Sequence, residues 1–176
     1  MSTYLLRDDN LIQSGTITIE EHYENSLKQG QRSIINKRTG MTLLLEHYNM
    51  GKLDGERKLW NEFGHIRMCE NYKDGQLNGE RTVWYCNNPD KKSLVENYKN
   101  GKLDDDRMIY YANGQLYIYE HYVEGKLDGE RCEFFLDGSS LKSEGFKNNL
   151  HHGERKIWDR NGELLLHEEY NNGELK

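Results

Sequence analysis

The sequence predicts an all-β protein, folded as an elongated single-layer antiparallel meander of about six to seven stacked β-hairpin repeats of about 24 residues each. Three observations support this prediction. An aromatic residue recurs at nearly constant spacing, glycines recur at fixed distances from it, and each repeat carries a glutamate and an arginine at matching positions. The pattern is continuous and no stretch has the composition of a linker, so we expect residues 1–176 to form a single repeat array.

The aromatic anchor of each repeat stands two positions after a glutamate. Successive anchors are 24 to 26 residues apart, and the longest step contains Pro89, the one proline of the chain. Glycines follow most anchors by three and by seven residues, as expected for tight turns with positive φ. Glycines at this frequency also argue against helices. The anchors are Tyr23, Tyr48, Tyr72, Tyr98, Tyr122, Phe146 and, in a partial last repeat, Tyr170.

An ionic cross-strand pair is predicted in every complete repeat. If the glycine-containing loop is the hairpin turn, the glutamate two residues before the anchor lies opposite the arginine nine residues after it. By the same register, each anchor ring covers the glycine seven residues further along. The predicted pairs are Glu21–Arg32, Glu46–Arg57, Glu70–Arg81, Glu96–Arg107, Glu120–Arg131 and Glu144–Arg155.

Strand alternation places the anchors and ionic pairs on one face of the sheet and a second aromatic column on the other. Two interpretations of this column stay open. Either the rings pack on one another along the ribbon, or they form a partly exposed interaction face, because a single-layer sheet cannot cover both of its faces. The column consists of Trp60, Trp84, Tyr110, Phe134 and Trp158.

Charge and composition narrow the classes of function. The net charge is −6, with both signs mixed along the chain and no basic cluster, which disfavours binding to nucleic acid and to anionic membranes. No apolar run approaches the ~20 residues of a membrane span, and Met1–Tyr4 begin no signal peptide. The 3 cysteines have neither metal nor redox spacing, which indicates reduced thiols in an intracellular, cytoplasmic protein.

The sequence contains no catalytic or cofactor-binding motif. His22, His47 and His121 hold equivalent positions in different repeats, at least roughly 10 Å apart, whereas a zinc ion needs its ligands within about 2.3 Å. His151 and His152 are expected to be solvated turn residues. We therefore expect no catalytic residue, no metal site, no cofactor and no enzymatic activity.

The stretch from Tyr48 to Trp60 resembles a MORN repeat, with an aromatic anchor, glycines three and seven residues later and a second aromatic at twelve. Recurrence of this pattern makes the resemblance specific, and it extends over residues 11–176. The chain is similar to the variant class found in YwqK-like antitoxin proteins of bacteria and in MORN-repeat proteins of giant viruses of the Marseillevirus type. Common MORN repeats have glycines where this chain has the paired glutamate and arginine.

The resemblance implies a non-enzymatic structural or protein-interaction scaffold. MORN proteins often form elongated dimers, so we expect a homodimer in the cytoplasm, or in the host cytoplasm or virion if the protein is viral. Within the partial repeat, Glu168 has no arginine after it, which leaves this end open to a second copy. The N-terminal end and the aromatic column are competing dimer sites. The candidate dimer end comprises Glu168, Tyr170 and Leu175.

Two alternative functions remain. Similarity to the YwqK-like group implies an antitoxin or immunity-like inhibitor, whose acidic surface would block a basic partner protein. Peripheral lipid binding is suggested by the family, but a net charge of −6 without a basic patch disfavours it.

Overall fold

The computed structural model describes residues 16–176, so the expectation about a signal peptide at Met1–Tyr4 lies outside the described range. The regular secondary structure of this part is β-strand throughout, and it holds no helix long and apolar enough to cross a membrane. The strands are β1 Ile17–Glu20, β2 Tyr23–Glu24, β3 Leu27–Lys28, β4 Gly30–Asn36, β5 Thr42–Asn49, β6 Lys52–Leu53, β7 Gly55–Trp60, β8 Ile66–Lys73, β9 Gln76–Leu77, β10 Gly79–Trp84, β11 Lys92–Lys99, β12 Lys102–Tyr110, β13 Leu116–Val123, β14 Lys126–Phe134, β15 Ser140–Lys147, β16 Leu150–Trp158, β17 Leu164–Asn171 and β18 Glu174–Leu175.

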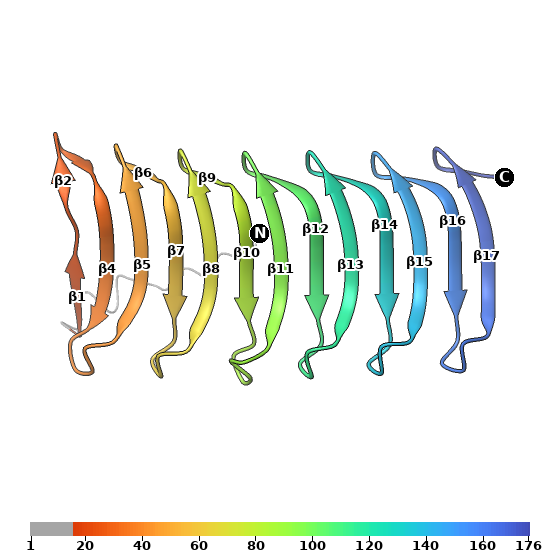
Figure 1. Cartoon of the computed structure of the whole chain (residues 1–176), viewed down its shortest axis with the longest axis horizontal. Coiled ribbons are helices and arrows are strands. Elements are labelled where there is room, and N and C mark those ends of the chain that lie inside the picture. The colour runs from red at the N-terminus through yellow and green to blue at the C-terminus, as the bar shows by residue number, and fades with distance from the viewer. Residues whose placement is uncertain (1–15) are drawn as a thin grey trace.

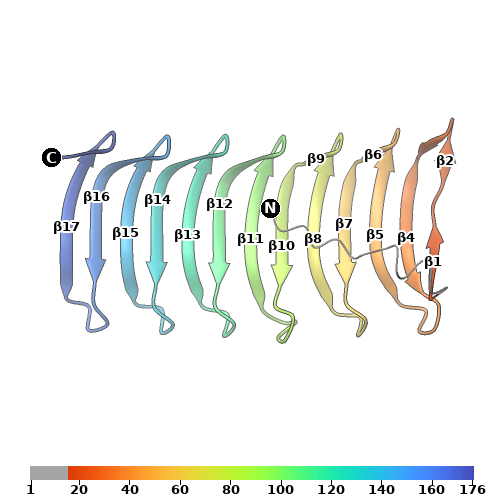
Figure 2. The same cartoon turned by 180° about the vertical axis from the view of Figure 1, so that it is seen from behind.

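Hairpin follows hairpin in one antiparallel sheet that runs from β1 to β18. The two-residue strands β6 and β9 attach beside β5 and β8, and β2 pairs separately with β3. Figures 1 and 2 show a single row of strands from both sides, with no second layer of described residues over either face. The structure thus confirms the predicted all-β, single-layer meander.

The turn that follows each anchor contains two consecutive residues with positive φ. In Asp74-Gly75 the φ angles are 51° and 83°, and in Asn100-Gly101 they are 50° and 78°. Turns of this kind match the twist of antiparallel strands, and Asn, Asp and Gly tolerate their conformation best. The turns also stack along one edge of the sheet, because the amide of Gly75 donates to the carbonyl of Leu53 at 2.7 Å.

A bulge in each hairpin changes the register that the sequence predicts. Glu96 lies opposite Arg107, but Tyr98 lies opposite Leu103, with a register shift between the two pairs. The prediction that an anchor covers the glycine seven residues further along is therefore wrong. That glycine faces the anchor of the next repeat, as Gly79 faces Tyr98. The reason is that the extra residues of the bulge move the glycine out of its own hairpin's pairing.

Positive φ explains why glycine recurs in the bulge. The φ angles of Gly55 and Gly129 are 111° and 129°, a region that other residues adopt only with strain. Asp105 occupies the equivalent position in its own repeat, with a φ of 86°. The backbone at this position therefore disfavours the aspartate, and packing of the fold does not explain why it is there.

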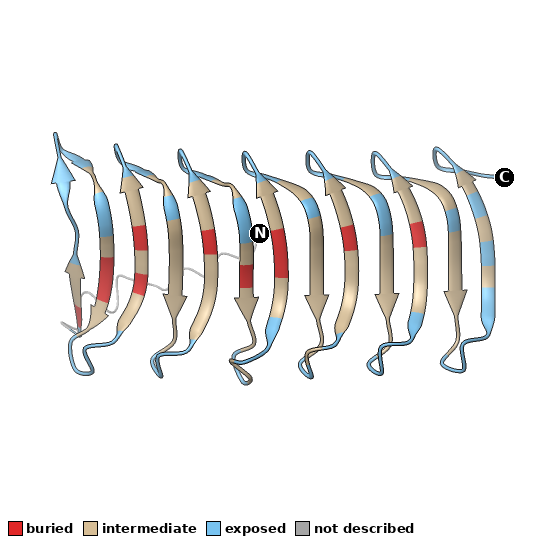
Figure 3. Ribbon diagram, viewed as in Figure 1, coloured by how far each residue is buried: buried red, intermediate tan, exposed pale blue. Residues whose placement is uncertain are grey.

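The sheet has little apolar core. Among residues 16–176, the buried apolar side chains are those of Ile17, Ile34, Leu44 and Val95, and no large side chain is fully buried. Glutamates are buried instead, and bands of buried residues recur at a similar height on alternate strands of the row in Figure 3, such as β11, β13 and β15. Since an unpaired buried charge is strongly unfavourable, these carboxylates must find partners. The buried glutamates are Glu46, Glu70, Glu96, Glu120 and Glu144.

Met50→Asn is expected to stabilise the fold by about 1 kcal/mol, because Met50 is 74% exposed and holds a turn position with a φ of 47°, where asparagine is better tolerated. The reverse change at the equivalent turn position, Asn100→Met, serves as the matched control and should destabilise by a similar amount. Urea denaturation followed by circular dichroism measures both. Equal stability of all three proteins would contradict the assignment of the turn type.

Candidate interaction surface and polar pocket

The predicted glutamate and arginine of each hairpin are in direct contact. Nε of Arg57 donates to Oε1 of Glu46 at 2.9 Å, and Nε of Arg81 donates to Oε1 of Glu70 at 2.8 Å. Each arginine also donates through Nη1 to the glutamate of the following repeat, as Arg57 does to Oε2 of Glu70 at 2.9 Å. The contacts therefore form a continuous ionic ladder, of which the sequence predicted only the half within hairpins. In order, the ladder is Glu21, Arg32, Glu46, Arg57, Glu70, Arg81, Glu96, Arg107, Glu120, Arg131, Glu144, Arg155 and Glu168.

Glu168, which we expected to lack an arginine, has one. It accepts a hydrogen bond from Nη1 of Arg155 at 2.7 Å and another from the hydroxyl of Tyr170 at 3.0 Å. The prediction failed because it considered only the arginine that follows each glutamate, whereas the preceding repeat supplies one as well. Leu175 lies opposite Tyr170 and is 59% exposed. The candidate dimer end is thus assembled in one place, but without an unpaired carboxylate.

A tyrosine hydroxyl gives most ladder glutamates a third donor. The anchor Tyr72, for example, donates to Oε2 of Glu70 at 3.1 Å. Phe146 has no hydroxyl, and in that repeat the ammonium group of Lys142 contacts Glu144 at 2.8 Å. The other anchors that donate in this way are Tyr23, Tyr48, Tyr98, Tyr122 and Tyr170.

Contacts within the ladder change the pKa values of Glu46 and of three anchor tyrosines. Burial alone would raise the pKa of Glu46, but hydrogen bonds from its two arginines outweigh burial and lower the pKa below its usual value. Burial, together with the neighbouring carboxylate, raises the pKa of Tyr48 to about 12. The pKa values of Tyr72 and Tyr98 are raised to about 12 for the same reasons. The folded ladder therefore favours the ionised form of Glu46 and the neutral form of these three tyrosines.

The five rings of the aromatic column, from Trp60 to Trp158, are all half-buried. Sequence analysis missed a second set of rings, one residue after the column. The hydroxyl of Tyr85 donates to the carbonyl of Tyr110, and that of Tyr111 donates to the carbonyl of Phe134 at 2.9 Å. These bonds join neighbouring repeats, while the column itself remains partly accessible.

His151 and His152 are not turn residues, and that prediction is wrong. Both lie in β16 and are half-buried. The His151 ring is 4.5 Å from the ring of Phe146 and 5.0 Å from that of Tyr170, measured between centroids. The reason for the error is that the turn forms three residues earlier in the chain, at residues 148–149, where both φ angles are positive.

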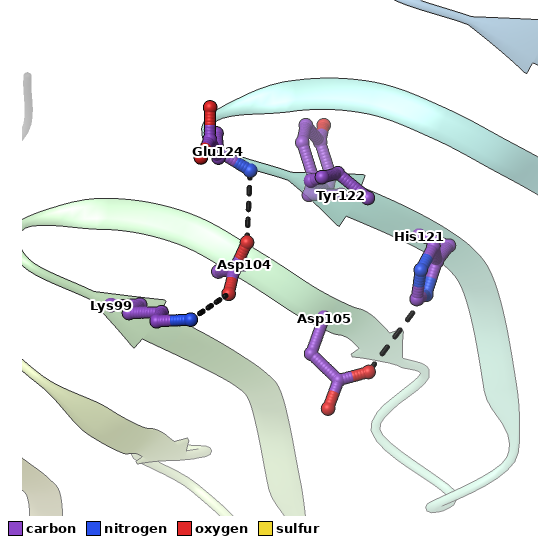
Figure 4. Close-up of a pocket in the computed structure, with 7 residues that line it drawn as sticks. Lys99, Asp104, Asp105, His121, Tyr122 and Glu124 are labelled. Atoms are coloured by element: carbon purple, nitrogen blue, oxygen red, sulfur yellow. Dashed lines mark hydrogen bonds and ion pairs between the residues drawn. The ribbon is translucent and has the colours of Figure 1, made fainter.

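A shallow pocket of about 380 Å³ lies beside β12 and β13 (Figure 4). Nδ1 of His121 is 2.9 Å from Oδ1 of Asp106 and 3.8 Å from Oδ1 of Asp105. Sequence analysis missed this cluster, although Asp105 in a column of glycines was its signal. The pocket is lined by Lys99, Asp104, Asp105, His121, Tyr122, Val123 and Glu124.

The repeat matches a known protein family. The family described as MORN repeat variant matches residues 53–74, 107–124 and 152–172. The chain is a MORN-repeat protein. The three matched segments lie in different parts of one continuous sheet, so the MORN repeats form a scaffold of stacked hairpins with an extended surface for interaction.

No curated protein matches the MORN-repeat chain. Among solved structures, a crystal structure of TarM is 14% identical, over 84% of this chain and 24% of that one, with a TM-score of 0.24. A mutant of S. aureus TarM in complex with fondaparinux, alpha-GlcNAc-glycerol and UDP is 11% identical, over 86% of this chain and 24% of that one, with a TM-score of 0.26. The chain spans about a quarter of the length of these structures, and scores this low support no functional argument.

Glu96→Gln is expected to destabilise the protein by about 3 kcal/mol, because it leaves Arg81 and Arg107 without their shared, buried carboxylate. Urea denaturation measures the change. The matched control is Glu169→Gln, at an exposed glutamate outside the ladder, which should have no measurable effect. A loss at Glu96 no larger than that at Glu169 would show that the ladder does not stabilise the sheet.

Stability should fall as pH rises from about 10 to about 12. Folding raises the pKa of Tyr48, Tyr72 and Tyr98 from about 10 to about 12, so the neutral phenol is favoured in the folded state. Their contribution is complete below pH 10 and is lost as pH rises through 12. Urea midpoints measured between pH 8 and pH 12 test this expectation.

The control for the alkaline transition replaces these three tyrosines together by phenylalanine, which the chain already carries at Phe146. The variant should lose stability less steeply above pH 10. An identical pH dependence in both proteins would assign the transition to lysines or to other groups.

Proposed function

We propose that this MORN-repeat protein is a non-enzymatic protein-interaction scaffold, and that one of its partners is a second copy of itself. The observation that carries the proposal is a single-layer sheet with half-buried aromatic rings along one column. Within residues 16–176 neither a second layer nor a helix covers these rings, and partly exposed rings favour association with another surface. The free thiols of the three cysteines agree with an intracellular location, in the cytoplasm or, for a viral protein, in the host cytoplasm or virion.

The aromatic column is the surface that we favour for the homodimer. Two sheets that pack face to face bury their inner side chains in a common core, and a two-fold axis makes one surface serve both copies. The rings of Trp60, Trp84 and Tyr110 lie on alternate strands, β7, β10 and β12, so they repeat at a constant step along the sheet. A second copy with the same step can match them in register.

The end of the sheet at β17 and β18 is the competing surface. Leu165 and Leu175 are 65% and 59% exposed there. Glu168 does not need an arginine from another copy, because Arg155 of the same chain already donates a hydrogen bond to it. For this reason we place the aromatic column first.

The antitoxin-like function and lipid binding remain alternatives. An acidic chain, with a net charge of −6, suits a small basic protein partner better than an anionic membrane. Sedimentation with vesicles of acidic lipids tests the second alternative, and co-purification of a small basic protein from the native cell supports the first.

Sedimentation equilibrium of the purified chain, at tens of micromolar, tests the proposed dimer. We expect a dimer for the wild-type protein and a monomer for the double variant Trp84→Glu with Tyr110→Glu, because charges on the column would be buried at the interface. Met50→Glu is the control, since Met50 is 74% exposed and lies in a turn at the opposite edge of the sheet, where Glu124 holds the equivalent position.

Three results separate the possibilities. A wild-type monomer would exclude self-association. A dimer that survives the column changes but is lost in Leu165→Glu would move the interface to the end of the sheet. Circular dichroism of each variant establishes that the β-sheet is retained, so that loss of the dimer is not loss of the fold.

A further inference from the structure

Three potential metal ligands lie close together at β12 and β13, and two of them, Asp105 and His121, line the pocket. One ligand atom each from Asp105, Asp106 and His121 lies within 4.8 Å of the others. Asp105 and Asp106 come from the bulge of β12, and His121 comes from β13, directly opposite Asp106 in the sheet. Figure 4 shows the carboxylate of Asp105 and the imidazole of His121 facing each other across the pocket. The set combines one imidazole nitrogen with two carboxylates, so it is more than an acidic patch.

The other junctions between repeats serve as internal comparisons. The positions of Asp105 and Asp106 are elsewhere held by glycine followed by glutamate or glutamine, and the position of His121 is held by another histidine, asparagine, glycine or glutamate. Within the described part of the chain, this junction alone brings two carboxylates and an imidazole together in such a group. The equivalent residues are 30, 31 and 47; 55, 56 and 71; 79, 80 and 97; 129, 130 and 145; and 153, 154 and 169.

The structural roles at this junction leave Asp105 unexplained. Asp106 has clear partners, since it accepts from the hydroxyl of Tyr119 at 2.7 Å and pairs with His121 at 2.9 Å. Asp105 has a side chain that is 69% exposed, and its backbone adopts a φ of 86° that glycine would hold more easily. Oδ1 of Asp105 lies 3.8 Å from Nδ1 of His121. The carboxylate therefore adds little to the fold and faces the pocket.

The geometry suits a small divalent ion. Ligand bonds of about 2.1 Å in a tetrahedral site place ligand atoms about 3.4 Å apart. The two distances from Nδ1 of His121, 2.9 Å and 3.8 Å, lie on either side of this value. On its other side the ring packs over Gly129 and fills the space of a side chain there, because a Cβ at this position would lie only 3.1 Å from its Cδ2. Tyr119, bonded to Asp106, holds that carboxylate as outer-shell partners hold the ligands of metal sites.

We propose that Asp105, Asp106 and His121 bind a first-row divalent transition metal ion, with water completing its coordination. Zn²⁺ is bound in proteins by both imidazole nitrogen and carboxylate oxygen atoms. At Nδ1 of His121 the ion takes the place of the hydrogen bond to Asp106, any proton held there passes to water, and the ion joins β12 to β13 beside the bulge that β12 forms against β11. The ion would therefore stabilise this junction, independently of whether the chain forms a dimer.

Titration of the full chain with CoCl₂ tests the site, read by equilibrium dialysis and by visible absorption. Cobalt is chosen because the spectrum distinguishes nitrogen and oxygen ligands from the thiolates of the three cysteines. We expect one ion per chain, a spectrum without thiolate-to-metal bands, and an increase in the melting temperature on binding.

Two variants remove one ligand each and install residues that the chain itself uses at equivalent positions, so both should fold. They are Asp105→Gly, as at Gly79, and His121→Asn, as at Asn97. Loss of an outer-shell partner alone weakens metal binding about 10- to 100-fold, so loss of a ligand should weaken it at least tenfold. The matched control is His47→Asn. In the wild type, Nδ1 of His47 contacts the backbone carbonyl of Glu56 at 2.9 Å and not a carboxylate.

The outcomes decide between a metal site and a simple ion pair. Binding that is lost in both variants and kept in the His47 control supports the site. Asp105→Gly should then melt no lower than the wild type without cobalt, but gain nothing when cobalt is added. Absence of saturable binding to the wild type, or binding that both variants retain, would overturn the proposal.

Discussion

The fold depends on the pairing of buried glutamates with arginines across a sheet over which residues 16–176 form no second layer. Each interior ladder carboxylate lies between two guanidinium groups, one from its own hairpin and one from the hairpin before it. A buried carboxylate without these donors is strongly unfavourable, so the pairs fix both the register within a hairpin and the stacking between hairpins. The ladder thus serves a purpose that an apolar core serves in most domains, since only four apolar side chains are buried in the described residues.

Departures from the repeat are informative because the remaining repeats show what the backbone needs. Phe146 lacks the hydroxyl that other anchors donate, and Lys142 supplies a donor to Glu144 in its place. This departure is compensated within the same repeat, as expected for a residue whose role is structural. Asp105 shows the opposite behaviour: it replaces a glycine that the backbone prefers, and its carboxylate is exposed toward His121. An uncompensated departure of this kind points to a ligand.

The two proposed roles use different parts of the same sheet. The aromatic column lies toward the ends of β7, β10, β12, β14 and β16, whereas the pocket lies beside β12 and β13, next to the bulge that β12 forms against β11. A single-layer array can carry both because each hairpin contacts mainly its neighbours, so a change in one repeat leaves the others in place. Such an array therefore offers its partners a large accessible surface, whereas a compact domain buries more of its surface.

The sequence by itself determined the repeat length, the hairpin in each repeat and the ionic pair within each hairpin, because these depend on residues close together in the chain. It did not determine how one hairpin stacks on the next. The contact of Arg57 with Glu70, the position of Gly79 opposite the anchor Tyr98 and the arginine partner of Glu168 all arise between repeats. Residue offsets counted from the hairpin turn predict partners correctly only if the antiparallel register is unbroken, and the bulge shifts that register. The approach of Asp105 to His121 likewise joins two repeats, so only the tertiary structure brings these ligands together.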